Sequence, residues 1–229
     1  MSPSGDASRP ETSPPEGGPV TTLYLARHGR TALNAAGALR GHIDVPLDAV
    51  GCLEAEALGA VLAQKGPSAI VSSPLVRAQQ TALPLAERTG LPIATDARLA
   101  DRFYGAWAGT SVKEVIERWG SLDLAPGVEA VAEVRERALA ALADAAREAK
   151  GGPVVVVSHD AVNRIALCGL DQRLGSPDEL PQETGCFNVL HCRPMGAGQL
   201  DWEVVLVNQV PRDIPGPAFQ SKSTAKEAP

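Results

Sequence analysis

Aromatic residues and long hydrophobic runs are scarce in this sequence of 229 residues. Phe, Trp and Tyr make up 3% of the chain, so small aliphatic side chains must fill the core of any folded domain. The longest strongly apolar run is Val154–Val157, whereas a membrane-spanning helix needs about 20 such residues. The first twenty residues contain no apolar segment of the kind found in signal peptides, so we expect no secretory leader.

Cysteines are also few, and basic residues are outnumbered by acidic ones. The four cysteines form no Cys-x-x-Cys pair, and their gaps suit neither a zinc ribbon nor a disulfide scaffold. We therefore expect reduced thiols and a cytoplasmic location. Lys and Arg number 21 against 27 Asp and Glu, which gives a net charge of −6. This balance argues against nucleic acids and anionic membrane surfaces as partners.

The two ends of the chain differ in composition from its middle. Residues 1–20 and 211–229 are rich in Pro, Ser and charged or small residues, and they have too little apolar surface to offset the entropy of ordering. We expect a disordered leader and a disordered tail there. The chain as a whole is 44% hydrophobic and 21% charged, which is typical of a globular protein. We expect residues 21–210 to form a single domain.

Between the tails, strand-like and helix-like segments alternate. The apolar patterns predict strands over 21–26, 69–72 and 154–158, and two late strands over 187–192 and 202–208 that could pair at a sheet edge. Helices are expected over 48–64, from Ser73 (as N-cap, with Pro74 as first helical residue) to Gly90, over 111–119, over 129–150 and up to 170. This alternation predicts an α/β three-layer sandwich, with a mostly parallel central sheet and helices on both faces.

Basic residues follow three of these strands at the point where each strand ends. They are Arg27 and His28 after 21–26, Arg77 one turn beyond 69–72, and His159 after 154–158. Because the carboxyl ends of parallel strands meet at one edge of a sheet, we expect these side chains to lie together.

Two arginines and two histidines at one edge suit a phosphoryl group. Guanidiniums offer planar pairs of donors to phosphate oxygens, and an imidazole can act as a nucleophile when it is unprotonated. Neighbouring Arg charges favour that neutral form. There is no Walker-type Gly-rich loop and no dense carboxylate cluster, so the pattern calls for neither a metal nor a cofactor.

Four blocks of sequence, taken in order, resemble the histidine phosphatase superfamily, the cofactor-dependent phosphoglycerate mutase-like proteins. The first reads Leu-Tyr-Leu-Ala-Arg-His-Gly-Arg-Thr-Ala-Leu-Asn over 23–34 and continues with Gly-His-Ile-Asp-Val-Pro-Leu over 41–47. The second is Val-Ser-Ser-Pro-Leu-Val-Arg-Ala-Gln-Gln-Thr-Ala over 71–82. The third is Leu-Ala-Asp-Arg-Phe-Tyr-Gly-Ala-Trp-Ala-Gly over 99–109, and the fourth is Val-Val-Val-Val-Ser-His-Asp over 154–160. The resemblance implies a phosphoglycerate mutase-like fold.

The resemblance also implies a role for individual residues. It makes His28 the nucleophile that becomes phosphohistidine, and it assigns the phosphate pocket to Arg27, Arg77 and His159. Thr31 and Asn34 match positions that add hydroxyl and amide donors to that pocket.

The acid/base carboxylate implied by the resemblance falls at Asp101, where the family usually has the longer Glu. Asp160 directly follows His159 and matches the proton donor of the acid phosphatase branch, so it stays an alternative; the Gly-x-Trp-x-Gly context favours Asp101. The stretch 126–130 is a degraded form of a family Pro-Gly-Gly-Glu-Ser segment, so Glu129 is expected to start a helix.

The leading hypothesis is a metal-independent phosphomonoester hydrolase that acts through phosphohistidine on a small phosphorylated metabolite. The alternatives are a cofactor-dependent phosphoglycerate mutase and a non-catalytic phospho-ligand binding protein. About 45 residues separate Gly109 from the valine strand, and two helices account for most of them, which leaves little for a lid and favours hydrolysis. Contacts to the substrate are expected from His42, Arg102, Phe103 and the segment 110–128, and the late strands offer an edge for a homodimer.

Overall fold

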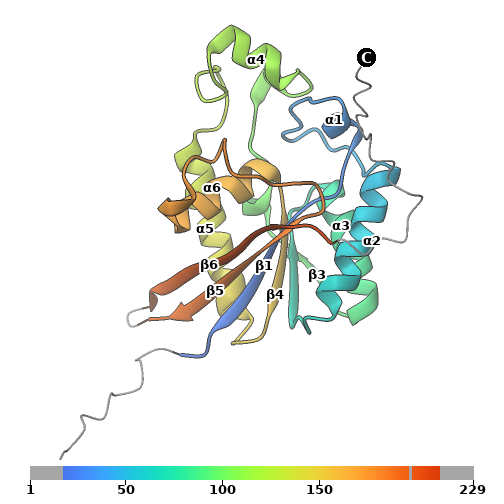
Figure 1. Ribbon diagram of the computed structural model, residues 1–229, viewed down its shortest axis with the longest axis vertical. Coiled ribbons are helices and arrows are strands. Elements are labelled where there is room, and N and C mark those ends of the chain that lie inside the picture. Colours follow the sequence, from blue (N-terminus) through green and yellow to red (C-terminus); the bar gives the residue numbers. More distant parts are fainter. Residues whose placement is uncertain (1–17, 196–197, 212–229) are drawn as a thin grey trace, which may run out of the picture.

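The fold is described from a computed structural model, which covers residues 18–195 and 198–211 (Figure 1). Its strands form one six-stranded sheet in the order β3-β2-β4-β1-β5-β6. The strands are β1 (Thr21–Arg27), β2 (Ala69–Ser72), β3 (Ile93–Thr95), β4 (Val154–Ser158), β5 (Phe187–Pro194) and β6 (Leu200–Gln209). β1 to β4 pair in parallel, whereas β5 is antiparallel to both β1 and β6. The predicted mostly parallel sheet and the pairing of the two late strands are confirmed.

The helices are α1 (Ala32–Ala35), α2 (Ala49–Ala63), α3 (Val76–Thr89), α4 (Val112–Trp119), α5 (Val131–Glu148) and α6 (Asp160–Leu170). Short 3₁₀ turns are formed by η1 (Ala97–Leu99), η2 (Gly105–Trp107) and η3 (Gln172–Leu174). The four-residue α1 and the three-residue β3 were absent from the sequence prediction, because elements this short carry no periodic signal.

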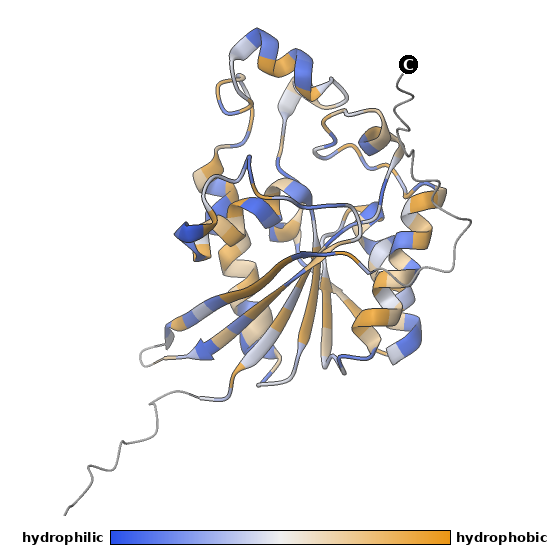
Figure 2. Ribbon diagram, in the orientation of Figure 1, coloured by the Kyte–Doolittle hydropathy of each residue, from blue (hydrophilic) through white to orange (hydrophobic). Residues whose placement is uncertain are grey.

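The valines of β4 explain why helices cover both faces of the sheet. Side chains alternate across a strand, so Val154 and Val156 pack into one hydrophobic cluster, with α5 and α6. Val155 and Val157 pack into a second cluster, with α2 and α3. All four are buried. The three-layer prediction is therefore confirmed, and Figure 2 shows hydrophobic residues concentrated along the central strands.

Two predicted helix starts are wrong. The helix expected from Ser73 and Pro74 begins at Val76, because Asp44 accepts a 2.7 Å hydrogen bond from the Val76 N–H and so caps α3 from a distant loop. The long helix expected from Glu129 begins at Val131, because the Glu129 carboxylate is bound to other partners, described below.

The strand register brings the carboxyl ends of β1, β2 and β4, which carry or precede the predicted site residues, to the same edge of the sheet. Arg27, the last residue of β1, is paired with Ser158 of β4, and Ser72 of β2 is paired with Val157. Three strands therefore end side by side. Beyond this edge a small third cluster buries Leu39, Tyr104, Val115 and Ala125 around α4, which Figure 1 shows at the end of the molecule.

The predicted leader and tail lie almost entirely outside the described residues, so the boundaries 1–20, 21–210 and 211–229 stay predictions. In the part of the chain that is described, no helix is both long and apolar enough to span a membrane.

Candidate active site

His28 follows directly on β1 and is fully buried. Its Nδ1 lies 2.7 Å from the carbonyl oxygen of Gly29. A carbonyl can only accept, so Nδ1 carries the proton and Nε2 presents a lone pair. Burial lowers the pKa of His28 well below its ordinary value, and the nearby charges of His159, Arg27 and Arg77 lower it further. The imidazole is therefore neutral, with an unprotonated Nε2.

Arg27 and Arg77 flank this imidazole and are held by backbone carbonyls. The Arg27 guanidinium donates to the carbonyl of Gln182 and lies 3.8 Å from Asp160. Arg77 is completely buried and donates to the carbonyls of Gly41 (2.8 Å) and Ile43 (3.0 Å). These contacts position both guanidiniums while leaving the Nε–H of each without a protein partner.

His159 directly follows β4 and faces His28, with 5.1 Å between the ring centroids. Its Nε2 is 2.7 Å from the hydroxyl of Ser73, and its Nδ1 is 4.0 Å from Asp101. Burial is the largest cause that lowers the pKa of His159 well below its ordinary value, followed by the charge of Arg77. Ser73 was predicted to cap a helix; its hydroxyl orients this second imidazole and also accepts from the Leu75 N–H at 3.3 Å.

Arg27, His28, Arg77 and His159 form a cluster, and Arg40 is a further member of it. The sequence did not indicate Arg40. Its positive charge contributes to the lowered pKa of both His28 and His159, and its side chain lines a cavity together with Asp160. Its Nε is buried without a hydrogen-bond partner. The residue precedes the Gly-His motif at 41–42, and no strand end or spacing pointed to it.

Unsatisfied nitrogens gather at this one place. Within the described residues, seven buried side-chain polar atoms have no hydrogen-bond partner, and five of them belong to the cluster. They are Nε of Arg27, Arg40 and Arg77, Nε2 of His28 and Nδ1 of His159. Buried polar groups are nearly always paired, so the three unpaired guanidinium N–H groups indicate a binding site for a ligand with several acceptors.

Thr31 and Asn34 are satisfied mainly by each other. The Thr31 hydroxyl donates to Asn34 Oδ1 at 2.8 Å and accepts from the Asn34 N–H at 3.2 Å, which caps α1. Thr31 is fully buried. That the two contact a phosphate stays a prediction.

Asp101 and Asp160, the two candidate proton donors, have different surroundings. Asp101 is buried, with one oxygen 3.1 Å from Arg77 and the other accepting from the Arg102 N–H. The side chain of Asp160 is 23% exposed and lies 2.5 Å from Arg164. Asp101 thus lies among the buried nitrogens, whereas Asp160 lies at their edge.

Arg137 of α5 holds the loop that carries Asp101. Its guanidinium forms a two-point ion pair with Glu129, at 2.7 and 2.9 Å. Its remaining donors bind the carbonyls of Arg98 (2.6 Å), Ala100 (2.7 Å) and Asp101 (3.3 Å). All five N–H groups of Arg137 are therefore used. The sequence assigned Glu129 to a helix start, and it carried no signal for this clamp.

A cavity of about 450 Å³ adjoins the cluster. It is lined by Arg40, Tyr104, Asp160 and by two of the four predicted substrate contacts, Arg102 and the segment 110–128. His42 and Phe103 are not among the lining residues. His42 instead lies 2.8 Å from the Asp101 carbonyl and against the Phe103 ring, so it supports the Asp101 loop.

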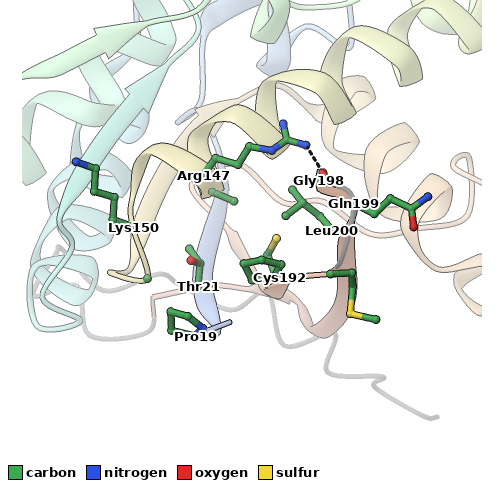
Figure 3. A pocket seen from close by; sticks show the side chains of 12 residues that line it. Pro19, Thr21, Arg147, Lys150, Cys192, Gly198, Gln199 and Leu200 are labelled. Atoms are coloured by element: carbon green, nitrogen blue, oxygen red, sulfur yellow. Dashed lines mark hydrogen bonds between the residues drawn. The ribbon is translucent and has the colours of Figure 1, made fainter. Parts of the chain in front are cut away.

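A second cavity, of about 400 Å³, lies at the opposite end of the sheet (Figure 3). Thr21, the first residue of β1, lines it, whereas the cluster surrounds the last. The hydrogen bond drawn there joins the Arg147 guanidinium to the Gly198 carbonyl (Figure 3). Neither this cavity nor any other part of the described chain brings together three His, Cys, Asp or Glu side chains in a way that could hold a metal ion.

The neutral histidines make stability depend on pH. Both pKa values lie below the unfolded value of about 6.5, so the unfolded chain takes up more protons in weak acid and is favoured there. Between pH 7.5 and 5.5 we expect the free energy of unfolding to fall by about 2 to 3 kcal/mol from the two residues together. Urea denaturation at both pH values measures this. His28→Asn should remove about half of the fall, and a stability that is the same at both pH values would contradict the neutral pair.

Two of the known proteins to which this chain is similar are phosphatases. A metal-independent phosphoserine phosphatase from Arabidopsis thaliana is 32% identical over 187 residues, covering 76% of this chain and 77% of the relative. A glucosyl-3-phosphoglycerate phosphatase from Mycolicibacterium vanbaalenii is 41% identical over 96 residues, covering 42% of this chain and 43% of the relative, so that match spans less than half of either protein.

Similarity to solved structures extends over more of the chain. The native structure of a mycobacterial glucosyl-3-phosphoglycerate phosphatase matches with a TM-score of 0.73 and 25% identity, covering 83% of this chain and 99% of that one. The family profile described as histidine phosphatase superfamily (branch 1) matches residues 23–206. This chain therefore belongs to the histidine phosphatase superfamily, as the resemblance of its four sequence blocks predicted.

Proposed function

We propose that the chain is a metal-independent phosphomonoester hydrolase that forms a phosphohistidine on His28 and acts on a small phosphorylated metabolite. The observation that carries the proposal is the neutral, Nδ1-protonated His28 with its free Nε2 among buried, unpaired guanidinium nitrogens. Membership of the family and the phosphatases among its relatives support the same activity.

In the first step, the lone pair of His28 Nε2 attacks phosphorus and the ester P–O bond breaks. Arg27, Arg77 and His159 hold the equatorial oxygens, and Arg40 adds a third guanidinium. The leaving alkoxide takes a proton from the Asp101 carboxyl. The incoming phosphoryl group competes for the Arg77 donor that Asp101 accepts from at 3.1 Å.

In the second step, water attacks the phosphorus of phosphohistidine and gives a proton to the Asp101 carboxylate. The N–P bond breaks and its electron pair returns to His28 Nε2. Inorganic phosphate leaves, and both side chains regain their initial states. One carboxyl group thus serves as acid and then as base.

Asp101 is favoured over Asp160 as the proton carrier because of its position. Asp101 is buried, it lies 4.0 Å from His159, and Arg137 holds the loop that carries it. Asp160 is held by Arg164 at 2.5 Å and lies 3.8 Å from Arg27, so its charge is already shared between two guanidiniums.

The alternative function is phosphoglycerate mutase, and a probable phosphoglycerate mutase from Yersinia enterocolitica is 32% identical over 166 residues. A mutase must keep water from its phosphoenzyme. Between Gly109 and β4, α4 and α5 account for 26 of the 44 residues, and the longest stretch outside them, 120–130, is short for a cover over the site. This favours hydrolysis. A non-catalytic binding protein would have no need of the His28 nucleophile together with His159 and the Asp101 carboxylate.

We further propose that the enzyme is a cytoplasmic homodimer. β6 is an edge strand of the sheet, with Val205 40% and Leu206 47% exposed. Pairing with a second copy would cover this edge and these side chains. The cytoplasmic location is supported by four cysteines that are all free thiols.

The nucleophile is tested by trapping the phosphoenzyme. Wild-type protein should hydrolyse 4-nitrophenyl phosphate in the presence of EDTA, and an acid-labile, base-stable phosphoryl label should appear on quenching. His28→Asn should lose at least 10³-fold in kcat and form no label. His191→Asn, which changes a partly exposed histidine of β5, should keep both. Turnover by His28→Asn, or a label stable to acid, would contradict the proposal.

The proton donor is tested by varying the leaving group, since an alkoxide needs protonation far more than nitrophenolate does. Asp101→Asn should lower kcat/KM for glycerol 2-phosphate by about 10²–10⁴-fold and that for 4-nitrophenyl phosphate much less. Asp160→Asn should lower both to a similar, smaller extent. The opposite result for the two variants would assign the role to Asp160.

Arg137 is expected to be a positioning residue for Asp101. Arg137→Lys keeps the charge but provides three donors in place of five, so the loop over 98–103 loses part of its support. We expect kcat/KM for glycerol 2-phosphate to fall about tenfold or more, with a smaller fall for 4-nitrophenyl phosphate. Arg135→Lys, an exposed change on the same helix, is the matched control. An equal fall for both substrates would indicate a structural role alone.

A further inference from the structure

The cavity of about 450 Å³ beside the cluster lies where the alcohol part of a phosphomonoester would extend. Two of its lining residues connect it with the reacting groups. Asp160 lies 3.8 Å from Arg27, and Tyr104 shares the loop of Asp101. The volume is within the usual range for small-molecule sites and exceeds what a phosphoryl group alone requires.

The charged side chains of this cavity are already paired with one another. Arg102, 6% exposed, binds Asp123 at 2.7 Å. Arg164 binds Asp160 at 2.5 Å. Asp178, exposed at the rim, adds a negative charge. Arg40 also lines the cavity, and its Nε is one of the buried nitrogens without a hydrogen-bond partner.

Beyond Arg40, the lining therefore offers no guanidinium that lacks a carboxylate partner. A carboxylate or second phosphate on the substrate would have to compete with Asp123 or Asp160 for its cation, beside a phosphoryl group that is itself a dianion. A hydroxyl group meets no such competition, because each Arg–Asp pair presents a donor and an acceptor side by side and a hydroxyl can use both.

We propose, on the basis of the function proposed above, that the cavity binds an uncharged, polyhydroxylated leaving group of up to sugar size. Hydroxyls bind at the Arg102–Asp123 and Arg164–Asp160 pairs, and the carbon skeleton packs on apolar lining residues that include Leu39, Val112 and Leu122. The preferred substrates are then monophosphates of sugars and polyols.

Matched substrates separate charge from size. Glycerol 3-phosphate and 3-phosphoglycerate differ in having a hydroxymethyl group or a carboxylate at the same place, and glucose 6-phosphate adds size. We expect kcat/KM to be highest for glucose 6-phosphate, then glycerol 3-phosphate, and at least tenfold lower for 3-phosphoglycerate than for glucose 6-phosphate. A kcat/KM for 3-phosphoglycerate equal to or above that for glycerol 3-phosphate would overturn the proposal.

Asp123→Asn tests the pairing itself. It removes the charge that neutralises Arg102, so the ratio of kcat/KM for 3-phosphoglycerate over glycerol 3-phosphate should rise at least threefold. Glu56→Gln is the matched control, because Glu56 is similarly exposed and also pairs with an arginine, Arg88, but on α2 and α3 away from the cavity. An unchanged ratio in Asp123→Asn, or the same rise in Glu56→Gln, would contradict the assignment.

Failure of this proposal is distinguishable from failure of the proposed function. Hydrolysis of 4-nitrophenyl phosphate reports the phosphohistidine chemistry whatever the leaving-group preference is. If no substrate is turned over, the hydrolase is disproved, and calorimetric titration of the His28→Asn variant with the same three phosphates still measures the cavity. Tighter binding of glucose 6-phosphate than of 3-phosphoglycerate would support the proposal, and the reverse order would overturn it.

Discussion

The hydrogen bond from His28 Nδ1–H to the Gly29 carbonyl is the interaction on which the site depends. It determines the tautomer, and the tautomer determines which nitrogen can attack. Gly29 is tightly enclosed, since a Cβ there would lie 2.5 Å from the carbonyl oxygen of Gly51 in α2. The close approach of these two backbones holds the turn after β1, and with it the imidazole, against the second layer of the sandwich.

The cluster around this imidazole lowers the stability of the fold. A buried polar group without a partner costs about 1–3 kcal/mol, and five such nitrogens lie within one site. The hydrophobic layers on both sides of β1 and β4 offset that cost. The same five nitrogens are fully oriented by carbonyls and neighbouring side chains before a substrate binds. The proposed phosphate site would therefore need no reorganisation, at the expense of stability.

Features that repeat along the chain could be predicted from the sequence. The valines of β4 and the alternation of strands and helices indicated a sandwich, and the rule that parallel strands end together placed Arg27, His28 and His159 at one edge. What escaped prediction depends on contacts between distant segments. Ser73 was predicted to cap a helix, but Asp44 caps α3, and the Ser73 hydroxyl contacts His159, 86 residues away.

Arg40 and Arg137 could not be predicted from the sequence, for a related reason. Arg40 stands on a loop without periodicity, and only the folded chain brings it to the cavity that also contains Asp160. Arg137 has the spacing of an ordinary surface residue of α5, yet its five donors meet a carboxylate and three carbonyls that no local pattern connects. The sequence sufficed to bring the candidate reacting groups together at one edge of the sheet, whereas the groups that position them required the structure.

The protonation state of His28 tests the account most directly. Nitrogen-15 NMR of the imidazole, in protein labelled at histidine, distinguishes the protonated from the unprotonated ring nitrogen. The account predicts a proton on Nδ1, a lone pair on Nε2, and no change in either resonance between pH 8 and 5.5. A resonance that titrates near 6.5, or a proton on Nε2, would contradict it, because His28 would then lack the free nitrogen that the phosphoryl group requires.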